Sequence, residues 1–514
     1  MNLEYFLLVV AVLLFLSIIA GKTGYRFGVP VLLLFLLIGM LAGSDGFGVI
    51  RLDNFHVAQN IGVLALICIL FSGGIDTKYT EIRPVARQGI VLATLGVLLT
   101  ALITGAFIYY LTNWFFPSVT LTFLESLLLA SVMSSTDSAS VFAVLRSRGL
   151  LLRHRLRPLL ELESGSNDPM AYMLTITLIS IIRQLQGASE MAVAWGGVAG
   201  MFIAQVIIGA GLGFALGKLA VRVINKINID NDSLYPILLL ACMLFVFSAT
   251  YFLKGNGYLA VYIAGLVMGN SKFVHKRTTL KFFDGLAWLF QILMFLTLGL
   301  LVNPTELLPI AGIGILVGIF MIIFSRPAAV LISLLPFRKM TFNDRIYVSW
   351  IGLRGAVPII FATYPMIAAI PHARTMFNIV FFITILSLMV QGTSVSWFAR
   401  LLGLARPHRP DRKVQDFAVD FADDIKSSMM QITVTEAMLA EGHKLLNLPL
   451  HDKALVVMVK RDENYFIPKG NTELKVNDKL LLICEDDKVL RETSAMLGLE
   501  TATRVEIEED DGYV

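Results

Sequence analysis

Five ionisable side chains lie within long apolar stretches of this sequence, where they could bind or carry charge: Asp137, Glu163, Asp168, Arg326 and Arg354. Placing one charged residue at the centre of a membrane-spanning helix costs about 2.5–3.5 kcal/mol on insertion scales, so such residues usually face a partner, a cavity or a transported ion. Five of them in one chain therefore predict a functional site within a membrane. Glu161, at the edge of such a stretch, is a secondary candidate.

The segment ESGSNDPMA (163–171) contains two of these carboxylates. At about 100° per residue, Glu161, Ser164 and Asp168 share one face of a helix, and Glu163 and Asn167 share a neighbouring face. An oxygen cluster of this kind suits a hard monovalent cation. The alternative is a Ser/Asn/Asp network that only joins helices.

A proline follows the second carboxylate. Because Pro169 has no N–H, the carbonyl of Gly165 loses its helical partner. We therefore expect the helix to break at Pro169 and to present a free carbonyl oxygen beside Asp168. A carboxylate in this position can hold either a proton or a metal ion but not both, which is the chemical requirement for exchange.

Two further apolar segments contain unusual residues. SVMSSTDSAS (131–140) combines a dense run of hydroxyls with Asp137, and GLRGAVP (352–358) contains Gly352, Gly355 and Pro358 around Arg354. Pro358 is expected to free the carbonyl of Arg354, which at membrane depth is tolerated only where protein or a water-filled cavity satisfies it. Both segments are predicted to be broken helices, although a proline kink used only for packing is the alternative for the second.

These residues must be positioned by membrane-spanning helices. Of the 514 residues, 56% are hydrophobic and 16% are charged, whereas soluble domains carry roughly 25% charged residues. The net charge of +4 gives no indication of a nucleic-acid partner. Thirteen segments are apolar enough and long enough to span a bilayer, namely residues 4–20, 29–43, 56–73, 89–111, 123–145, 159–182, 196–217, 234–253, 257–271, 284–302, 308–335, 346–369 and 376–399.

The basic residues in the connections agree with this division. Twenty Lys and Arg lie in alternate connections and four in the intervening ones. Because cytoplasmic loops carry an excess of Lys and Arg, the N-terminus is predicted outside and residues after 400 in the cytoplasm. The four basic residues of the intervening connections, which are predicted to lie outside, are Arg51, Arg183, Lys254 and Arg374.

The same division predicts an internal symmetry. If the seventh segment is a linker, segments 1–6 and 8–13 form two six-helix halves of opposite orientation, and inverted repeats with broken helices at the ion site are typical of secondary transporters. The fold class is therefore a polytopic α-helical membrane protein with thirteen transmembrane helices in two inverted six-helix repeats. The broken crossing helices are the fifth members, residues 123–145 and 346–369.

These motifs together resemble those of the monovalent cation:proton antiporter-1 family, which includes bacterial and animal Na⁺/H⁺ exchangers. The matching motifs are TD (Thr136, Asp137), ESxxND (residues 163–168) and GLRGA (352–356), and the resemblance covers residues 1–403. It implies that Asp168 alternately binds cation and proton. It further implies that Asp137, Thr136 and Ser164 complete the coordination and that Asn167 orients the site.

The resemblance also implies an intramembrane ion pair and a stoichiometry. A glutamate at the position of Glu163 pairs with an arginine in the eleventh span of the family, which favours Arg326 in FSRPAAV, with Arg354 as the other candidate. Asn167 in place of a second aspartate beside Asp168 resembles the electroneutral branch. No cofactor is implied beyond the transported K⁺ or Na⁺ and H⁺.

The composition changes after the last apolar segment. Residues 404–429 form a basic-to-acidic linker, and 501–514 form an acidic tail. Residues 430–500 contain two β-rich runs, KALVVMVKRD and DKLLLICED, and a segment with helical spacing, VLRETSAMLGL, so we expect a small α+β domain. This part resembles the TrkA-C module of potassium-conductance regulators.

The TrkA-C likeness implies a cytoplasmic regulatory domain, a homodimer formed through the membrane and cytoplasmic domains, and a small-molecule or nucleotide regulator bound to 430–500. The whole chain most resembles bacterial K⁺/H⁺ antiporters of the inner membrane. K⁺ is the favoured cation, and Na⁺ is the alternative.

Two other functions fit parts of the sequence. A regulator-gated cation channel is one, because TrkA-C modules also accompany potassium channels, but a T-V-G-Y-G filter is absent from the sequence. An intramembrane aspartyl protease is the other, because two buried aspartates can share a proton, but the sequence has no G-x-G-D motif. Secondary exchange without enzymatic activity is the favoured hypothesis.

Overall fold

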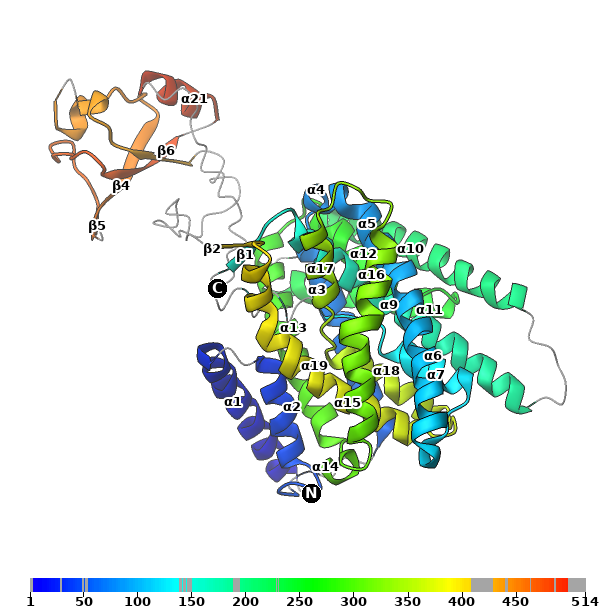
Figure 1. The fold of residues 1–514 in the computed structure, drawn as a ribbon. Helices are drawn as coiled ribbons and strands as arrows, with labels where there is room; N and C mark the ends of the chain where they lie inside the picture. The colour runs from blue at the N-terminus through cyan, green and yellow to red at the C-terminus, as the bar shows by residue number, and fades with distance from the viewer. Residues whose placement is uncertain are drawn as a thin grey trace. The chain divides into compact units, whose positions relative to one another are not determined.

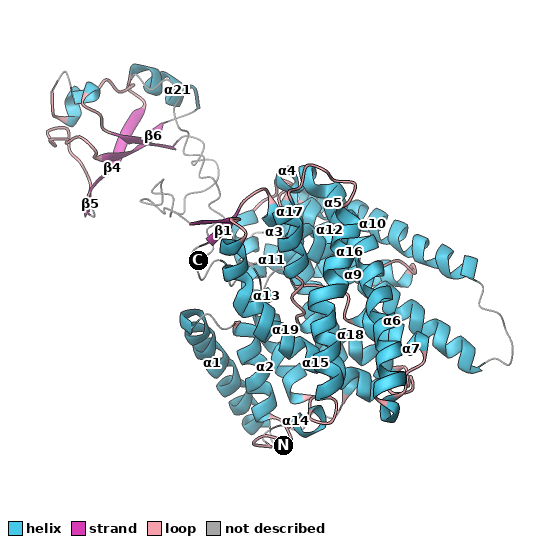
Figure 2. Cartoon of the chain, in the orientation of Figure 1, coloured by secondary structure: helices cyan, strands magenta, loops and turns pink. Residues whose placement is uncertain are grey.

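The computed structural model describes residues 3–27, 30–48, 50, 54–137, 141, 145, 150–187, 195–227, 229, 231–407, 429–439, 442–462, 464–484 and 487–497. It divides into two compact units, Met1–Pro407 and His408–Val514. The first is almost entirely helical, and the second contains a β-sheet (Figures 1 and 2). Most of the predicted linker and all of the predicted acidic tail lie outside the described residues.

The first unit is a bundle of helices joined by short connections. The helices of its first half are α1 (Leu3–Phe27), α2 (Val31–Ala42), α3 (Phe55–Asp76), α4 (Tyr79–Ile82), α5 (Ala86–Val91), α6 (Val97–Phe115), α7 (Phe123–Val132), α9 (Leu156–Gly187) and α10 (Trp195–Lys226). Those of its second half are α11 (Leu234–Phe252), α12 (Gly257–Gly269), α13 (Lys276–Leu300), α14 (Pro304–Leu307), α15 (Ala311–Phe320), α16 (Arg326–Leu334), α17 (Phe342–Trp350), α18 (Ala356–Ile367) and α19 (Ala373–Leu401). Helix occupies part of each of the thirteen predicted segments.

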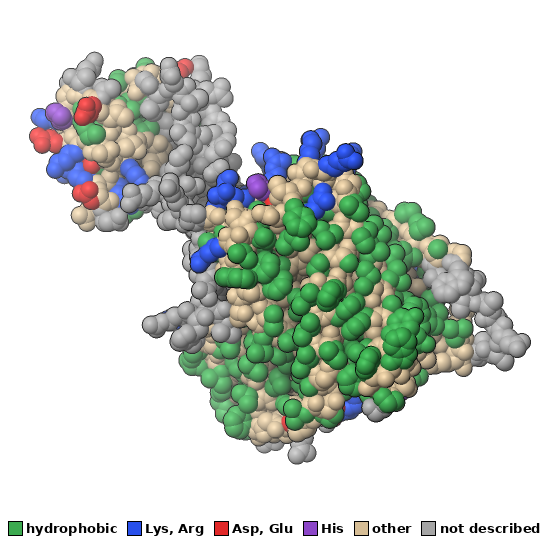
Figure 3. All heavy atoms as spheres, in the orientation of Figure 1, with side chains coloured by type: hydrophobic (Ala, Val, Ile, Leu, Met, Phe, Trp, Pro, Cys, Tyr) green, Lys and Arg blue, Asp and Glu red, His purple; other side chains and the backbone are tan. Residues whose placement is uncertain are grey.

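The helices are apolar on their outer surface as well as inside. Within the described part of the chain, seven helical stretches are long and apolar enough to cross a membrane, and five apolar helices are shorter. Large hydrophobic side chains such as Phe15, Phe245 and Phe324 are exposed, and apolar atoms cover the sides of the bundle in Figure 3. Because soluble proteins rarely expose apolar patches of this size, this surface is one that faces lipid.

One end of the bundle is basic. Lys and Arg side chains gather there in Figure 3, over the end where α4, α5 and the start of α17 lie in Figure 1. They include the exposed Arg83, Arg87, Arg153, Arg338 and Lys339. We call this end the basic face, and the end that contains α14 the opposite face.

Two helices are interrupted in the middle of the bundle, as the sequence predicts. α7 ends at Val132, where the hydroxyls of Ser131 and Ser134 donate to backbone carbonyls at 2.7 Å and so compete with helical hydrogen bonds. The second interruption, residues 351–355, separates α17 from α18. The sequence predicts that Pro358 frees the carbonyl of Arg354 within a broken helix, with a proline kink as the alternative. Instead, Pro358 lies in the first turn of α18, where a helix needs no N–H, and Arg354 precedes the helix.

The prediction that Pro169 breaks its helix is wrong. α9 continues from Leu156 through Pro169 to Gly187. A neighbouring helix is bonded to α9 at this level, because Asn256, at the start of α12, donates a hydrogen bond from Nδ2 to the carbonyl of Pro169 at 2.9 Å. Prolines are tolerated within membrane helices that pack against neighbouring helices.

Glycines allow four helices to pack closely. A Cβ on Gly39 of α2 would lie 3.0 Å from Cα of Gly299 in α13, and a Cβ on Gly74 of α3 would lie 3.3 Å from Cα of Gly265 in α12. Small residues are the usual means by which membrane helices approach one another. The result is two backbone-to-backbone contacts, α2 with α13 and α3 with α12.

A short antiparallel ribbon joins the basic face to the last helix. β1 (Leu150–Leu152) pairs with β2 (Ala405–Pro407), and Leu151 lies opposite Arg406. Gly403, with φ of +70°, turns the chain after α19, which glycine does without steric cost. By this pairing residues 405–407 belong to the first unit.

In its described residues, the second unit is a four-stranded antiparallel sheet with one α-helix. Its strands are β3 (Met429–Thr433), β4 (Ala454–Arg461), β5 (Asn464–Phe466) and β6 (Lys479–Cys484), in the order β3-β6-β4-β5, and its helix is α21 (Asp487–Met496). Both β-rich runs form strands, and the segment with helical spacing overlaps α21. The unit has a hydrophobic core of its own that includes Val459, Leu480 and Leu482.

Candidate ion-binding site

The two helix interruptions meet each other. The backbone N–H of Asp137 donates to the carbonyl of Leu353 at 2.8 Å, and the guanidinium of Arg354 donates to the carbonyl of Ser135. Backbone groups freed by each interruption are thus partly satisfied by the other, as burial in a membrane requires. We call residues 133–137 and 351–355 together the crossing.

The helix α9 lies against the crossing with the polar face that its sequence predicts. Ser164 donates from Oγ to the carbonyl of Thr136 at 2.8 Å, and Asn167 donates from Nδ2 to Oγ1 of Thr136 at 2.5 Å. Asp168 is buried on the same helix and interacts electrostatically with Asp137. The structure thus brings together Thr136, Asp137, Ser164, Asn167 and Asp168.

Two buried oxygens at this place have no hydrogen-bond partner among the described residues, Oδ1 of Asp168 and Oδ1 of Asn167, and the side chain of Ser135 lies beside the Asp168 carboxylate. Leaving a buried polar atom unsatisfied costs roughly 1–3 kcal/mol, so such atoms usually serve a purpose. Carboxylate, amide and hydroxyl oxygens are the ligands of hard cations. In the part of the chain described here, no group of three or more His, Cys, Asp or Glu side chains could hold a metal, so a cation at the crossing would rely on mixed oxygen ligands.

Gly355 leaves room for one of the carboxylates. A Cβ on Gly355 would come within 3.0 Å of both Cβ and Cγ of Asp137 and would contact its Oδ2. The Asp137 side chain therefore packs directly on the backbone of the other interruption. A glycine is required there by this close approach.

The buried ion pair lies beside the crossing. Arg326 donates from Nη2 to Oε1 of Glu163, and the two side chains are 2% and 1% exposed. The stem of Arg326 passes over Gly352, where a Cβ would lie 3.2 Å from its Cγ. Of the two arginines that the sequence left open, it is Arg326 that contacts Glu163.

Arg354 supports the crossing instead. Its guanidinium contacts Ser135, and its backbone N–H donates to Oγ of Ser387 in α19 at 2.9 Å. Ser387 in turn donates to Gln391, which donates to the carbonyl of Trp350 at 2.7 Å. This chain of hydrogen bonds ties both ends of the second interruption to α19. Glu161, the secondary candidate, accepts a hydrogen bond from Arg157 one turn earlier in α9, at 2.9 Å.

Sequence reasoning did not name Ser135, Ser387, Gln391 and Asn256. The hydroxyl run 131–140 indicated that one of its serines would be used, but not which one. Serine and asparagine at the ends or inside apolar helices are common, so no pattern distinguished Ser387, Gln391 or Asn256.

A model of the transmembrane sodium/hydrogen exchanger family matches residues 10–401. The chain belongs to the sodium/hydrogen exchanger family. A model of the TrkA-C domain matches residues 429–496, so both resemblances found in the sequence are confirmed. The family consists of multi-pass membrane transporters rather than enzymes.

Curated relatives in bacteria extend over most of the chain. The K(+)/H(+) antiporter NhaP of Alkalimonas amylolytica is 38% identical over 481 residues, which are 93% of this chain and 81% of that protein. The K(+)/H(+) antiporter NhaP2 of Shewanella baltica is 37% identical over 485 residues, or 94% and 82% of the two chains.

A solved structure has the same helical fold. The sodium proton antiporter MjNhaP1 of Methanocaldococcus jannaschii at pH 8 superposes with a TM-score of 0.65 at 22% identity, covering 78% of this chain and all of that one. At this identity the likeness concerns the fold alone. The fold is thus that of a helical membrane transporter with a soluble TrkA-C domain.

Proposed function

We propose that this exchanger moves a monovalent cation, K⁺ in preference to Na⁺, against H⁺, and that Asp168 binds the two in turn. The observation that carries the proposal is the set of unpartnered oxygens around Asp168 at the crossing of two broken helices. The names of the relatives favour K⁺. Membership of an exchanger family favours this function over the regulator-gated channel.

The residues at the crossing take different roles in this proposal. Asp168 carries the exchanged charge, and Asp137, Thr136 and Ser164 supply further oxygens. Asn167 is held by Thr136 and orients its own Oδ1 toward the ion. Glu163 and Arg326 neutralise each other, so that a single titrating carboxylate on α9 exchanges one cation for one proton and transport is electroneutral.

We further propose the thirteen-span arrangement with two inverted repeats. Counted within each repeat, the fifth span contains an interruption and the fourth span contains a π-helical turn. The two π-helical turns are Leu92–Gly96 and Met321–Ser325. The proposed repeat matches α2 with α12 and α3 with α13. It therefore converts the glycine contact between α2 and α13 into the glycine contact between α12 and α3. The caps Thr122 and Thr341, which begin α7 and α17, are 219 positions apart. The same spacing separates Ser135 from Arg354, whose contact joins the two interruptions, so these two residues occupy matching positions in the proposed repeats.

The orientation follows from the charges. Because the basic connections fall on the cytoplasmic side, we propose that the basic face lies in the cytoplasm and the opposite face in the periplasm of a bacterial inner membrane. Residues 1–403 would then form the antiporter domain, 430–500 the cytoplasmic regulatory domain, and the C-terminus would be cytoplasmic.

We propose that the TrkA-C domain regulates transport through the ribbon at the basic face. β2 is the last described segment before that domain, and its partner β1 precedes α9. The side chain of Asn343 in α17 also donates to the carbonyl of Leu402 at 3.2 Å. The exit from α19 is therefore bonded to α17, which leads to the crossing, and to the strand that precedes α9. A homodimer and a small-molecule or nucleotide ligand of residues 430–500 complete this proposal.

The test is proton movement in everted membrane vesicles that contain an acid-sensitive dye. K⁺, Na⁺ and Li⁺ are added in turn to wild type, Asp168→Asn and the control Asp232→Asn, whose side chain is 69% exposed. We expect K⁺ to dissipate the proton gradient with wild type and the control but not with Asp168→Asn. The same assay on a chain ending near residue 410 tests regulation by the TrkA-C domain. Absence of cation-dependent proton movement with both folded chains would refute the exchange function, and uncoupled ion current would favour a channel.

A further inference from the structure

Each of the two interrupted helices begins with a capping box whose carboxylate also contacts a histidine. At the start of α7, Oε2 of Glu125 accepts hydrogen bonds from N of Thr122 at 2.8 Å and from its Oγ1 at 2.9 Å. The other oxygen, Oε1, lies 3.5 Å from Nδ1 of His372. The Glu125 side chain is 5% exposed, whereas that of His372 is 47% exposed.

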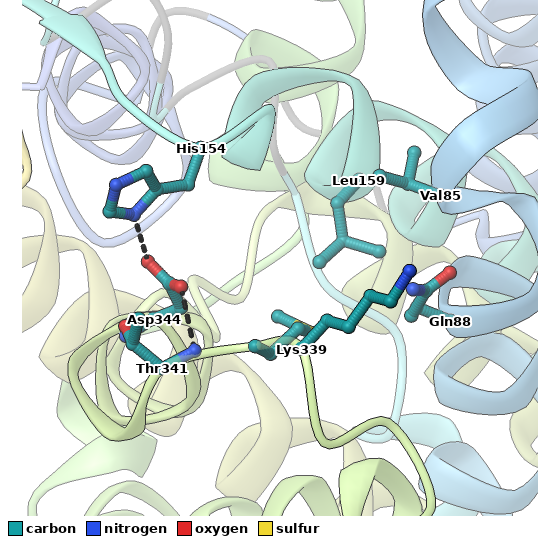
Figure 4. Close-up of a pocket in the computed structure, with 8 residues that line it drawn as sticks. Val85, Gln88, His154, Leu159, Lys339, Thr341 and Asp344 are labelled. Carbon is teal, nitrogen blue, oxygen red and sulfur yellow. Dashed lines mark hydrogen bonds and ion pairs between the residues drawn. The ribbon is translucent and has the colours of Figure 1, made fainter.

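The start of α17 repeats this arrangement. Oδ2 of Asp344 accepts from N of Thr341 at 3.0 Å, and Oδ1 lies 2.9 Å from Nδ1 of His154. Figure 4 shows His154 and Thr341 on either side of the carboxylate. Asp344 is 4% exposed and His154 is 51% exposed. In both cases a buried carboxylate caps the helix and a solvent-accessible imidazole covers its second oxygen.

The two histidines occupy corresponding places. His154 lies in the turn that follows the first interrupted segment and begins α9, and His372 lies in the turn that follows α18 and begins α19. Both have a left-handed backbone with φ of 57°, which is uncommon for a residue other than glycine. A capping box alone requires neither the histidine nor this conformation. Each interrupted helix is therefore tied to the turn that follows the other one.

The two contacts lie at opposite ends of the bundle. His154 and Asp344 line a pocket of about 290 Å³ at the basic face together with Gln88 and Lys339. His372 is at the opposite face, because Arg374, two residues later, binds Glu306 of α14 at 2.9 Å. Each histidine is thus accessible to the solution on one side of the membrane only.

We propose that His154 and His372 are positioning residues for the ion site, one for each face. Through Asp344 and Glu125 they fix the first turns of α17 and α7, and hence the crossing to which both helices lead. A protonated imidazole binds its buried carboxylate with a charge-assisted hydrogen bond, which is about twice as strong as a neutral one. The crossing is therefore held more firmly when the solution on that face is acidic. This inference rests on the proposed exchange function.

Other charges near the histidines act on them too. Around His154 the charged groups of the described residues are Asp344, Lys339 on the other side of the pocket, and Arg153 and Arg155 of its own turn. Around His372 they are Glu125 and Arg374, the latter neutralised by Glu306.

The test uses His154→Gln and His372→Gln in the full-length protein, with His56→Gln, an exposed histidine in the first turn of α3, as the matched control. Glutamine keeps a hydrogen-bonding side chain but cannot be protonated. The apparent affinity for K⁺ is measured while the pH of each side of the vesicle is varied separately. In wild type we expect the apparent affinity for K⁺ to change roughly tenfold with the pH at the basic face. His154→Gln should abolish this change and leave the response to pH at the opposite face intact. His372→Gln should act at the opposite face alone, and His56→Gln at neither.

Two results would overturn the inference: wild-type pH profiles in both variants, or a response of both variants to the same face. If neither the wild-type protein nor the chain ending near residue 410 moves protons, the exchange function fails, and thermal unfolding in detergent then decides about the histidines. If acid raises the Tm of the wild-type protein and this effect is absent from both histidine variants, the two contacts are supported. Identical pH dependence of Tm in all four proteins refutes them.

Discussion

Loss of either partner of the buried ion pair should destabilise the protein more than loss of the charge that we assign to exchange. The side chains of Glu163 and Arg326 are 1% and 2% exposed, so truncating one leaves the other charge buried and alone. For such pairs the cost is about 3–5 kcal/mol, a large part of the roughly 5–15 kcal/mol by which proteins are stable. Glu163→Ala and Arg326→Ala should therefore both unfold at much lower denaturant concentration than wild type.

The double variant separates this electrostatic effect from lost packing. Replacing both partners of a buried pair by apolar residues of similar size is often neutral or stabilising by about 1–4 kcal/mol. Glu163→Met/Arg326→Met should hence be more stable than either single methionine variant. Oε2 of Glu163 and Nε of Arg326 have no partner among the described residues, which adds to the benefit of removing both.

The assay is denaturant unfolding in detergent micelles, followed by tryptophan fluorescence, with Asp168→Asn as the control. Asparagine keeps the shape of Asp168 and removes a charge whose Oδ1 makes no hydrogen bond to the described residues, so its loss should be much smaller. The reasoning would be refuted if the two single losses simply added in the double variant, or if Asp168→Asn were as unstable as Glu163→Ala.

Three further predictions concern residues around the site. Gly355→Ala should weaken K⁺ binding by tenfold or more, because a misplacement of about 1 Å can cost on the order of 100-fold and the new Cβ would displace the Asp137 carboxylate. Half-saturation of proton release measures this effect, and Gly285→Ala, which meets nothing within 4 Å, should behave as wild type. Asn256→Ala should cost about 1–2 kcal/mol by removing the cap of α12 and the hydrogen bond to Pro169, whereas Asn256→Asp should restore only the cap. The hydrogen bond from Arg374 lowers the pKa of Glu306 to about 2 from 4.5, so Glu306 stabilises the fold above pH 4.5 and loses that effect as pH falls toward 2. The Tm difference between wild type and Glu306→Gln should therefore be greatest near neutral pH and should disappear near pH 2.

The helices and the carboxylates could be predicted because both depend on local properties of the chain. Hydropathy over about 20 residues located the helical segments, and charge within those segments singled out Asp137, Glu163 and Asp168. The two interruptions were predictable for the same reason, because a run of hydroxyls and closely spaced glycines weaken a helix wherever they occur.

Features that depend on tertiary contacts were not predictable. Pro169 would end an isolated helix, but α9 continues through it where it contacts α12, whose cap residue Asn256, far along the chain, donates to the carbonyl of Pro169. Ser387 and Gln391 look like ordinary polar residues of an apolar helix, and only their hydrogen bonds to the second interruption reveal their role. The three-residue strands β1 and β2 are too short to show a pattern, and pairing over such a distance leaves no local signal.

The contacts at the crossing indicate which parts can move independently during transport. The two interruptions are joined by the bond from Asp137 to Leu353 and by Arg354, and α9 and α19 are bonded to them through Thr136 and Ser387. Breaking these contacts would expose several buried polar groups in the membrane, each at a cost of roughly 1–3 kcal/mol. A cycle that dismantled the crossing at each turnover would have to supply that cost repeatedly. We therefore expect α7, α9, α17, α18 and α19, together with α16, whose Arg326 binds Glu163 of α9, to move as one body that carries the bound ion, with access changing at its boundary with the remaining helices. Pulse labelling of a Ser387→Cys variant, whose position bonds α19 to the crossing, should then find the cysteine equally protected with and without K⁺, while cysteines placed at that boundary change.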